Sequence, residues 1–186
     1  MNLKDYFESE LEEHRSVLEA TSTLGEEFAR LADECAKCIK NDGKILIFGN
    51  GGSAADAQHI ATELTVQYEK SRPAIAAIAL STDTSALTAI GNDFSFDDIF
   101  SRQVEALGRP GDVVIGISTS GNSTNVIKAF ETAKARGMVV AGLTGNNGGK
   151  MAGIADPLVI VPSKRTARIQ EMHILIGHIL CGTLEM

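Results

Sequence analysis

One stretch of this chain, residues 44–63, constrains the fold more than any other. Four apolar residues (45–48) run into the glycine-rich sequence Gly-Asn-Gly-Gly-Ser at 49–53, and a helical pattern follows. A strand that passes through a glycine-rich turn into a helix leaves several backbone N–H groups unpaired at one point. The helix dipole favours negative charge there. The stretch therefore predicts an anion-binding site between a strand and a helix.

The same strand and helix pattern continues along the chain. Further apolar runs at 75–80, 113–117, 139–143 and 158–161 alternate with helical patterns at 53–68, 84–90, 96–106 and 122–136, and a last helix begins near 166. Two helices joined near 21–23 precede the first strand. Continuous apolar strands alternating with helices indicate a parallel sheet covered on both faces. We expect one α/β domain over 1–186, with helices in 1–41 and an open five-stranded, flavodoxin- or Rossmann-like sheet in 42–186.

Composition excludes several classes of function. The 186 residues carry a net charge of −7 without a Lys/Arg cluster, which argues against a nucleic-acid partner. No apolar run reaches the roughly 18 residues that a membrane helix needs, and the first residues do not resemble a signal peptide. Three cysteines are too few for a disulfide framework, so we expect a cytoplasmic protein.

The spacing of Cys35 and Cys38 is compatible with a redox or metal pair. Both residues lie on an apolar helical stripe with Phe28 and Leu31, and no second pair follows. Burial in the core is therefore the favoured interpretation.

A second loop, Ser118-Thr-Ser-Gly-Asn-Ser123, follows the apolar run 113–117. Its four hydroxyls suit the three terminal oxygens of a phosphate. The alternative is that they only cap the next helix, but one cap needs one hydroxyl. In an open parallel sheet, two such loops face one crevice where the strand order reverses. The loops together favour a phosphate site.

The glycine spacing also matches a weak dinucleotide fingerprint, Gly49-x-Gly51-x-x-Ala54, with Asp83 near the place of a ribose-binding acid. We do not favour a nicotinamide cofactor, because the chain lacks a second domain to hold a hydride acceptor.

Two helices carry polar residues that chemistry could use. His59 and Glu63 are four residues apart, so they share one helix face and could bind a metal or act as an acid/base pair. In the last helix, polar residues interrupt an apolar pattern at Arg168, Gln170, Glu171, His173 and His178. His59 and His178 each have an alternative role as a structural histidine with satisfied hydrogen bonds. We favour function for His59 because its helix begins at the anion loop, and for His178 because a polar residue among apolar neighbours needs a partner.

Several of these segments together resemble one family. The segments are Gly49-Asn-Gly-Gly-Ser, Gln58-His59, Glu63-Leu-Thr, Ala89-Ile-Gly-Asn-Asp93, Gly116-Ile-Ser-Thr-Ser-Gly-Asn-Ser123 and Ala167-Arg-Ile-Gln-Glu-Met-His173. They resemble the phosphoheptose isomerases of the sugar-isomerase (SIS) fold family over nearly the whole chain. The resemblance implies conversion of sedoheptulose 7-phosphate to D-glycero-D-manno-heptose 7-phosphate, the first step toward lipopolysaccharide or other surface glycans. It also implies a cytoplasmic homotetramer, packed through its N-terminal helices, with active sites between subunits.

The resemblance also implies a set of site residues. The substrate-binding set is Asn50, Gly51, Gly52, Ser53, Glu63, Asn92, Asp93, Ser118, Thr119, Ser120, Ser123 and Gln170. A zinc ion would be held by His59, Glu63, Gln170 and His178, with Glu63 and His178 as the acid/base residues. Two roles for Glu63 compete, because a carboxylate that binds a metal is a poorer base for enediol formation.

The chain departs from the family pattern at Gln67, where the family usually carries an arginine. A neutral amide cannot supply the same charge-assisted bond, so Arg72 and Lys70 are the candidates to compensate. The rival class of function is non-catalytic. Some relatives bind a replication initiator, and others sense sugar phosphates through an attached DNA-binding domain.

The spacing of Gln170 and His178 raises a further expectation. Eight residues on one helix separate their Cα atoms by about 12 Å, which is hard to reconcile with two ligands of one ion. We therefore expect more than one subunit to contribute to the site, unless Gln170 precedes the regular part of the helix. Glu63 and His178 would then act across an interface.

Overall fold

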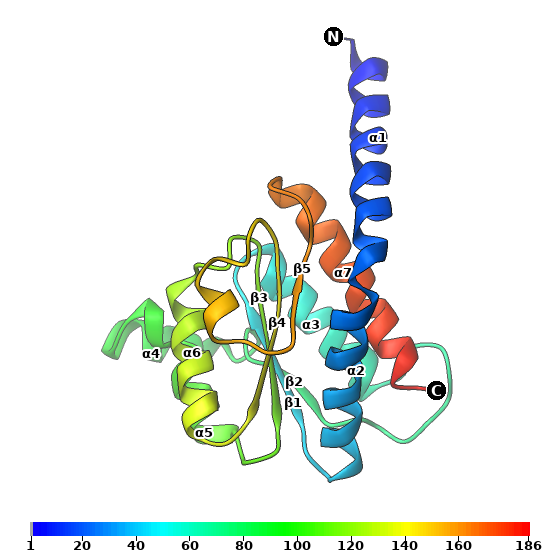
Figure 1. Ribbon diagram of the computed structural model, residues 1–186. Helices are drawn as coiled ribbons and strands as arrows, with labels where there is room; N and C mark the ends of the chain where they lie inside the picture. The colour runs from blue at the N-terminus through cyan, green and yellow to red at the C-terminus, as the bar shows by residue number, and fades with distance from the viewer. Residues whose placement is uncertain (1) are drawn as a thin grey trace.

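The computed structural model describes residues 2–186 and has a parallel sheet with helices on both faces (Figure 1). The strands are β1 (Ile45–Gly49), β2 (Ala77–Ala79), β3 (Val113–Ser118), β4 (Val139–Thr144) and β5 (Leu158–Ile160). They pair in the order β2-β1-β3-β4-β5, and each neighbouring pair is parallel. The order reverses between β1 and β3, where such sheets bind ligands. The predicted fold class is confirmed.

Helices cover the two faces with two separate cores. They are α1 (Leu3–Thr21), α2 (Gly25–Lys40), α3 (Gly52–Thr65), α4 (Thr84–Asp93), α5 (Ser101–Leu107), α6 (Thr124–Ala135) and α7 (Thr166–Thr183), with short 3-10 turns at Ser22–Leu24, Phe96–Asp98 and Gly149–Gly153. Residues of α2, α3 and α7 form one core with Ile45 and Ile47, and residues of α5 and α6 form the other with Leu46 and Phe48. Alternate side chains of β1 therefore enter different cores, which is why the strand is apolar throughout.

Three predicted boundaries were wrong. The run 75–80 forms a strand only at Ala77–Ala79, because the N–H of Ile75 bonds instead to the carbonyl of Leu64 at the end of α3. The helix predicted to reach Tyr68 ends at Thr65. The pattern 96–106 is a 3-10 turn followed by α5 rather than one helix, because Ser95 accepts a bond from the N–H of Asp97 and starts a separate turn.

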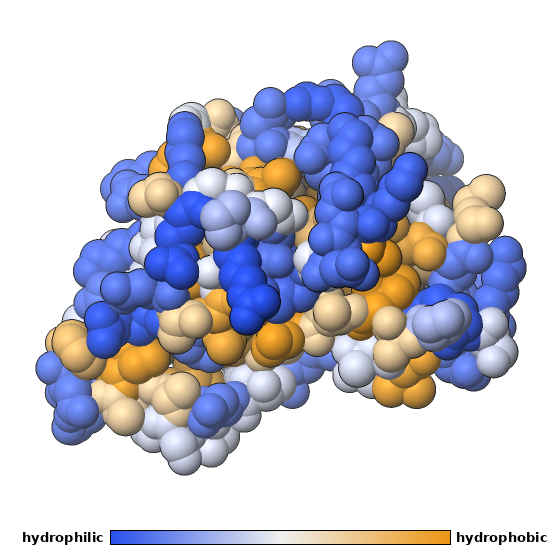
Figure 2. All heavy atoms as spheres, turned by 90° about the horizontal axis from the view of Figure 1, so that it is seen from below, coloured by the Kyte–Doolittle hydropathy of each residue, from blue (hydrophilic) through white to orange (hydrophobic). Residues whose placement is uncertain are grey.

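Other features of the surface and core follow the sequence. Cys35 and Cys38 are buried in the core between α2 and the sheet, as predicted. No helix within residues 2–186 has the length and hydropathy to span a bilayer. The face at the amino ends of the strands is polar with scattered apolar patches (Figure 2). Helix α1 extends away from the sheet (Figure 1).

Candidate active site

The turn between β1 and α3 is built so that its backbone lies open. A Cβ on Gly49 would lie 2.7 Å from the carbonyl oxygen of Ile117, so only glycine fits there. Gly51 has a φ of +57°, which glycine adopts without strain. Within residues 2–186, the N–H groups of Gly51 and Gly52 have no hydrogen-bond acceptor. Two donors at the start of α3 are therefore available to an anion. Ser53, by contrast, is buried.

The second loop keeps its hydroxyls free of helix capping. Ser123 is the N-cap residue of α6, but its side chain makes no capping bond and pairs with the Ser118 hydroxyl at 2.9 Å. Ser120 accepts a bond of 3.2 Å from the N–H of Asn122, and its side chain is exposed. The capping interpretation therefore fails for Ser123, and the loop retains hydroxyls and first-turn N–H groups for a ligand.

Side-chain hydrogen bonds join the loop after β1 to the start of α6, which follows the loop after β3. Asn50 and Asn125 exchange two amide hydrogen bonds of 2.9 Å each. The loops therefore face one crevice at the carboxyl ends of β1 and β3, as the sequence predicted. Sequence reasoning missed Asn125, although a polar residue at the second position of an otherwise apolar helix start was a signal for it.

Asn92 and Asp93 lie exposed at the end of α4, where the Asn92 amide donates to the Asp93 carboxylate at 2.8 Å. Their predicted contact with substrate stays a prediction. Asp83 caps the start of α4 by accepting from the N–H of Ala86. This structural role removes it as evidence for a dinucleotide site.

The histidines and the glutamate form one group. His59 Nε2 lies 2.8 Å from His178 Nε2 and 3.3 Å from Glu63 Oε1, and the candidate ligand atoms of the three residues lie within 4.8 Å of one another. The Glu63 side chain is 22% exposed and that of His59 is 48% exposed. The group therefore lies open to a ligand. Asp56, one turn before His59, has a buried Oδ2 without a hydrogen-bond partner in residues 2–186, and burial raises its pKa.

The group forms because α3 and α7 pack in the same direction. A Cβ on Gly177 would lie 2.6 Å from Cδ1 of Ile60, and a Cβ on Gly52 would lie 2.5 Å from Nε2 of Gln170. Missing side chains thus let the two helices approach closely. Gln170 consequently lies beside the anion loop, while His178 meets His59 about two turns further along.

This geometry corrects one expectation. We expected Glu63 and His178 to act across a subunit interface, but a single chain brings both into one group. The amide of Gln170 lies against Gly52 at the start of α3.

Comparison with known proteins agrees with this geometry. The SIS domain family matches residues 9–145 of the chain. The chain belongs to the SIS domain family. It is 57% identical to a phosphoheptose isomerase of Paramagnetospirillum magneticum over 100% of this chain and 97% of the relative. The structure of a phosphoheptose isomerase from Neisseria gonorrhoeae is 50% identical, covers 99% of both chains and superposes with a TM-score of 0.94. The structure of a phosphoheptose isomerase from Francisella tularensis is 37% identical and superposes with a TM-score of 0.95. The match covers 99% of this chain and 98% of that chain.

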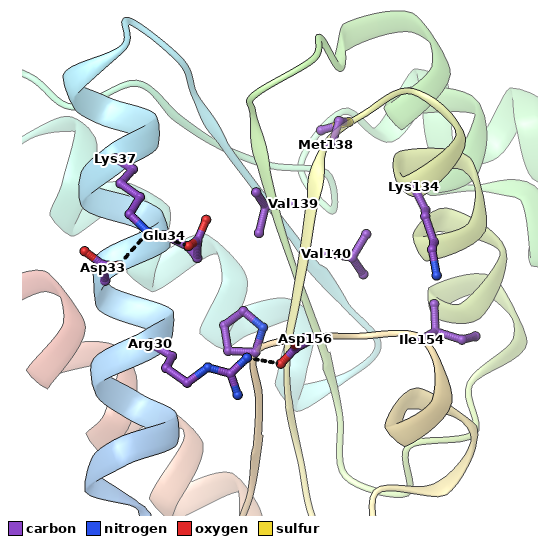
Figure 3. A pocket seen from close by; sticks show the side chains of 11 residues that line it. Arg30, Asp33, Glu34, Lys37, Lys134, Met138, Val139, Val140, Ile154 and Asp156 are labelled. Carbon is purple, nitrogen blue, oxygen red and sulfur yellow. Dashed lines mark hydrogen bonds and ion pairs between the residues drawn. The ribbon is translucent and has the colours of Figure 1, made fainter.

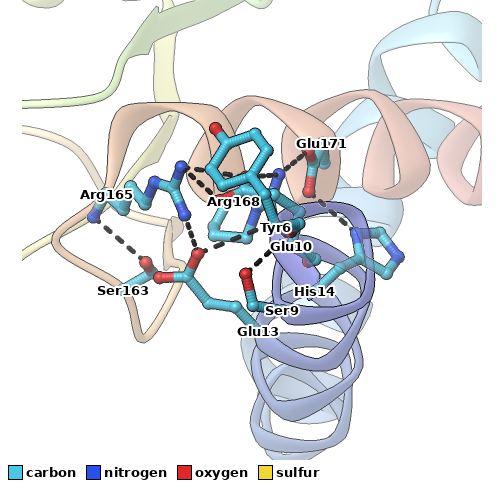
Figure 4. Close-up of polar contacts among 9 residues, drawn as sticks. All are labelled: Tyr6, Ser9, Glu10, Glu13, His14, Ser163, Arg165, Arg168 and Glu171. Atoms are coloured by element: carbon cyan, nitrogen blue, oxygen red, sulfur yellow. Dashed lines mark hydrogen bonds and ion pairs between the residues drawn. The ribbon is translucent and has the colours of Figure 1, made fainter. Parts of the chain in front are cut away.

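In this SIS domain, the other polar residues of α7 are structural. Arg168 is buried and donates to the carboxylate of Glu171 (Figure 4). It also donates to the backbone carbonyl of Glu10 in α1 at 2.6 Å. His14 of α1 contacts the Glu171 carboxylate at 2.8 Å. Arg165 pairs with Glu10 and Glu13. These contacts fasten α1 to α7.

His173 is fully buried, and its Nε2 contacts the carbonyl of Thr144 at 3.1 Å. Burial lowers the pKa of His173 to about 4, while the bond to Thr144 opposes the shift. It is a neutral core histidine.

A pocket of about 580 Å³ lies away from this site, between α2, α6 and the start of β4 (Figure 3). Its cations include Arg30 and Lys37, which pair with Asp156 and with Asp33 and Glu34. Lys134 is the third cation in its lining, so three cations face the three carboxylates of Asp33, Glu34 and Asp156. The pocket lining therefore has no excess of positive charge for an anion.

Arg72 does not compensate for the family arginine at position 67. Its guanidinium donates to the carbonyls of Glu63 and Leu64 at 2.8 Å each and to Glu185 at 3.0 Å. With those donors engaged inside the fold, it cannot serve the substrate. Gln67 itself is exposed.

Proposed function

We propose that this protein is a phosphoheptose isomerase, an aldose–ketose isomerase that converts sedoheptulose 7-phosphate to D-glycero-D-manno-heptose 7-phosphate. One observation carries the proposal: α3 starts at an open anion site, and about two turns later its His59 and Glu63 meet His178 of α7 in one group. Seven helical residues span about 10 Å. That length is comparable to an extended seven-carbon chain built from bonds of about 1.5 Å. A phosphate at one end would therefore leave the C1–C2 carbonyl region near the group.

The phosphate is bound by the N–H groups of Gly51 and Gly52 and by the hydroxyls of Ser118, Thr119, Ser120 and Ser123. These donors suit it because charge-assisted hydrogen bonds are the strong ones. The amide of Gln170, held against Gly52, is positioned to contact the substrate beside the same loop.

Isomerisation requires a proton to leave one carbon and return to its neighbour through an enediol. Glu63 takes this proton, since its carboxylate is partly exposed at the group. His178 moves a proton between the two substrate oxygens, because a neutral imidazole both donates and accepts. If the His59 and His178 nitrogens, 2.8 Å apart, share a hydrogen bond, one of the two must accept it.

The donor set also fits a zinc ion, since two imidazole nitrogens and a carboxylate oxygen converge within 4.8 Å. His59, Glu63 and His178 would hold the ion. When bound, zinc would polarise the substrate carbonyl. The resemblance implies Gln170 as a fourth ligand, and its amide lies against Gly52 beside the anion loop.

We further propose a cytoplasmic homotetramer that supplies heptose for lipopolysaccharide or another surface glycan. Exposed apolar residues on α1, including Leu3, Phe7 and Leu11, support packing of residues 1–41 between copies around the core of residues 42–186. Light scattering of the protein and of a Phe7→Glu variant tests this assembly.

The non-catalytic alternatives are not favoured. A protein that only binds a replication initiator or senses a sugar phosphate has no need to bring a carboxylate and two histidines together beside a phosphate loop. The 57% identity to a named phosphoheptose isomerase also supports the enzyme.

A coupled assay for D-glycero-D-manno-heptose 7-phosphate, with sedoheptulose 7-phosphate as substrate, tests the proposal. Turnover that depends on Glu63 supports it. Absence of turnover with this ketose, but turnover with another ketose phosphate, would assign a different sugar preference and implicate Gln67.

A further inference from the structure

A second set of contacts converges on the His59–Glu63–His178 group from outside it. Tyr68, in the segment after α3, stacks on His178 with ring centroids 5.6 Å apart and planes 18° apart. The same ring lies over Gly182, where a Cβ would be 3.4 Å from Tyr68 Cε1. The His178 ring is also in edge contact with His59, at 4.9 Å between centroids. His178 is therefore held between His59 and Tyr68.

The Tyr68 segment is in turn fastened by a buried carboxylate. Glu185, with a side chain only 1% exposed, accepts the N–H groups of Tyr68, Glu69 and Lys70 at 2.8, 2.9 and 2.8 Å. Arg72 Nε donates to it at 3.0 Å. Burial acts to raise the pKa of Glu185, but these donors outweigh burial and lower the pKa to about 2. All of these contacts favour the charged carboxylate.

Arg72 connects the same carboxylate to the end of α3. Its guanidinium donates to the carbonyls of Glu63 and Leu64, which lie in the last turn of the helix. The last carbonyls of a helix lack intrahelical partners, and a basic side chain that satisfies them fixes the end of the helix. The backbone of Glu63 is thus held by Arg72.

We propose that Glu185, Arg72 and Tyr68 are positioning residues for the His59–Glu63–His178 group. Glu185 holds Tyr68 against His178 and Arg72 against the carbonyl of Glu63, so one carboxylate orients both acid/base residues. The inference rests on the proposed function in one respect, namely that this group performs the chemistry. Outer partners of this kind set the orientation of the groups that bind or react, and their loss typically reduces activity or metal affinity by about 10- to 100-fold.

The test compares Glu185→Ala and Glu185→Gln with the wild-type protein. We expect Glu185→Ala to lower kcat by about 10-fold or more with little change in KM, because the phosphate loops are untouched. Zinc affinity, measured by calorimetry on the metal-free protein, should fall by a similar factor. Glu185→Gln should restore part of both, because its amide oxygen still accepts backbone N–H groups.

A spectroscopic readout keeps the proposal separate from the proposed function. In carbon–proton NMR spectra, the ring Hε1 resonance of His178 is assigned by its disappearance in His178→Gln. In Glu185→Ala, this resonance should lose the ring-current shift that the stacked Tyr68 ring causes. Tyr68→Leu should move it in the same way, and Tyr68→Phe should not. Val104→Ala, a cavity in the opposite core, serves as a control that lowers the melting temperature without moving the resonance.

The outcomes separate cleanly. An unmoved His178 resonance in Glu185→Ala overturns the proposal, as does a moved resonance with unchanged kcat and zinc affinity. If the wild-type protein has no isomerase activity, the proposed function fails. The NMR shift and the zinc titration then still decide whether Glu185 positions the group.

Discussion

The two halves of α7 use polar residues in opposite ways. In the first half, Arg168 and Glu171 bond to α1, and His173 is sealed in the core. In the second half, His178 faces the partly exposed His59 and Glu63. The sequence pattern is alike in both halves, an apolar helix interrupted by polar residues. What differs is that Arg168 and His173 are buried within the fold, whereas His178 meets side chains that stay accessible to a ligand.

The largest effect on activity is expected in the half of α7 that contains His178, at its partner Glu63. Glu63→Gln keeps the size of the side chain and removes the base, so kcat should fall by about 10²- to 10⁴-fold while the fold is kept. Steady-state kinetics and circular dichroism check this. A variant that keeps more than about a tenth of wild-type kcat would show that Glu63 is not the base.

A mixing experiment sharpens the same point. Because one chain contains the whole group, mixed oligomers of Glu63→Gln and His178→Ala protomers should recover no activity. If activity is recovered, with subunit exchange verified by mass spectrometry, Glu63 and His178 act across a subunit interface.

Substitutions in the first half of α7, which contains Arg168, should change the free energy of unfolding rather than the activity. Arg168→Ala removes a buried cation that bonds to Glu171 and to the backbone of α1, while Glu10 and Glu171 keep their contacts with Arg165 and His14. Unfolding should therefore become easier by about 2 kcal/mol, the size of a lost hydrogen bond to a charged group. Denaturant titration measures this. Arg102→Ala, which breaks an exposed pair with Glu105 and a contact with the Phe94 ring, is the control and should change stability by about 1 kcal/mol or less. If Arg168→Ala lowers kcat of the folded enzyme as strongly as Glu63→Gln does, the division of α7 is wrong.

His173 allows the division to be tested by pH. Its folded-state pKa of about 4 lies below the ordinary 6.5. The stabilisation from its neutral form is therefore complete above pH 6.5 and lost as the pH falls toward 4, a change of about 3 kcal/mol. His173→Gln should flatten the stability profile in this window. Met172→Leu, a buried neighbour that does not titrate, should keep the wild-type slope.

The smallest effect is expected in the phosphate loop. Ser120→Ala and Ser123→Ala each remove one charge-assisted donor, so each should weaken binding of the phosphorylated ketose by about 1.5–3 kcal/mol. KM should rise by the corresponding factor, and the melting temperature should stay nearly constant. The reverse result, a lower melting temperature with unchanged KM, would assign these hydroxyls to loop structure rather than to substrate.

The sequence alone determined the sheet and the loops, because these features are local. Strands are predicted by the apolar runs. The helix starts and the anion site are predicted by the glycine-rich turn at 49–53 and the hydroxyls at 118–123, each from a few neighbouring residues. The i and i+4 spacing of His59 and Glu63 likewise placed them on one face, as their 3.3 Å contact confirms.

Only the tertiary structure decided which distant residues meet. The close, same-direction packing of α3 and α7 brought His178 to His59 and sent Gln170 to Gly52, through glycines whose role no spacing rule reveals. It also placed Arg72 and Glu185 together at the end of α3, although charged residues usually lie at the surface. Side-chain partners more than a hundred residues apart depend on how helices pack, and local periodicity carries no information about that packing.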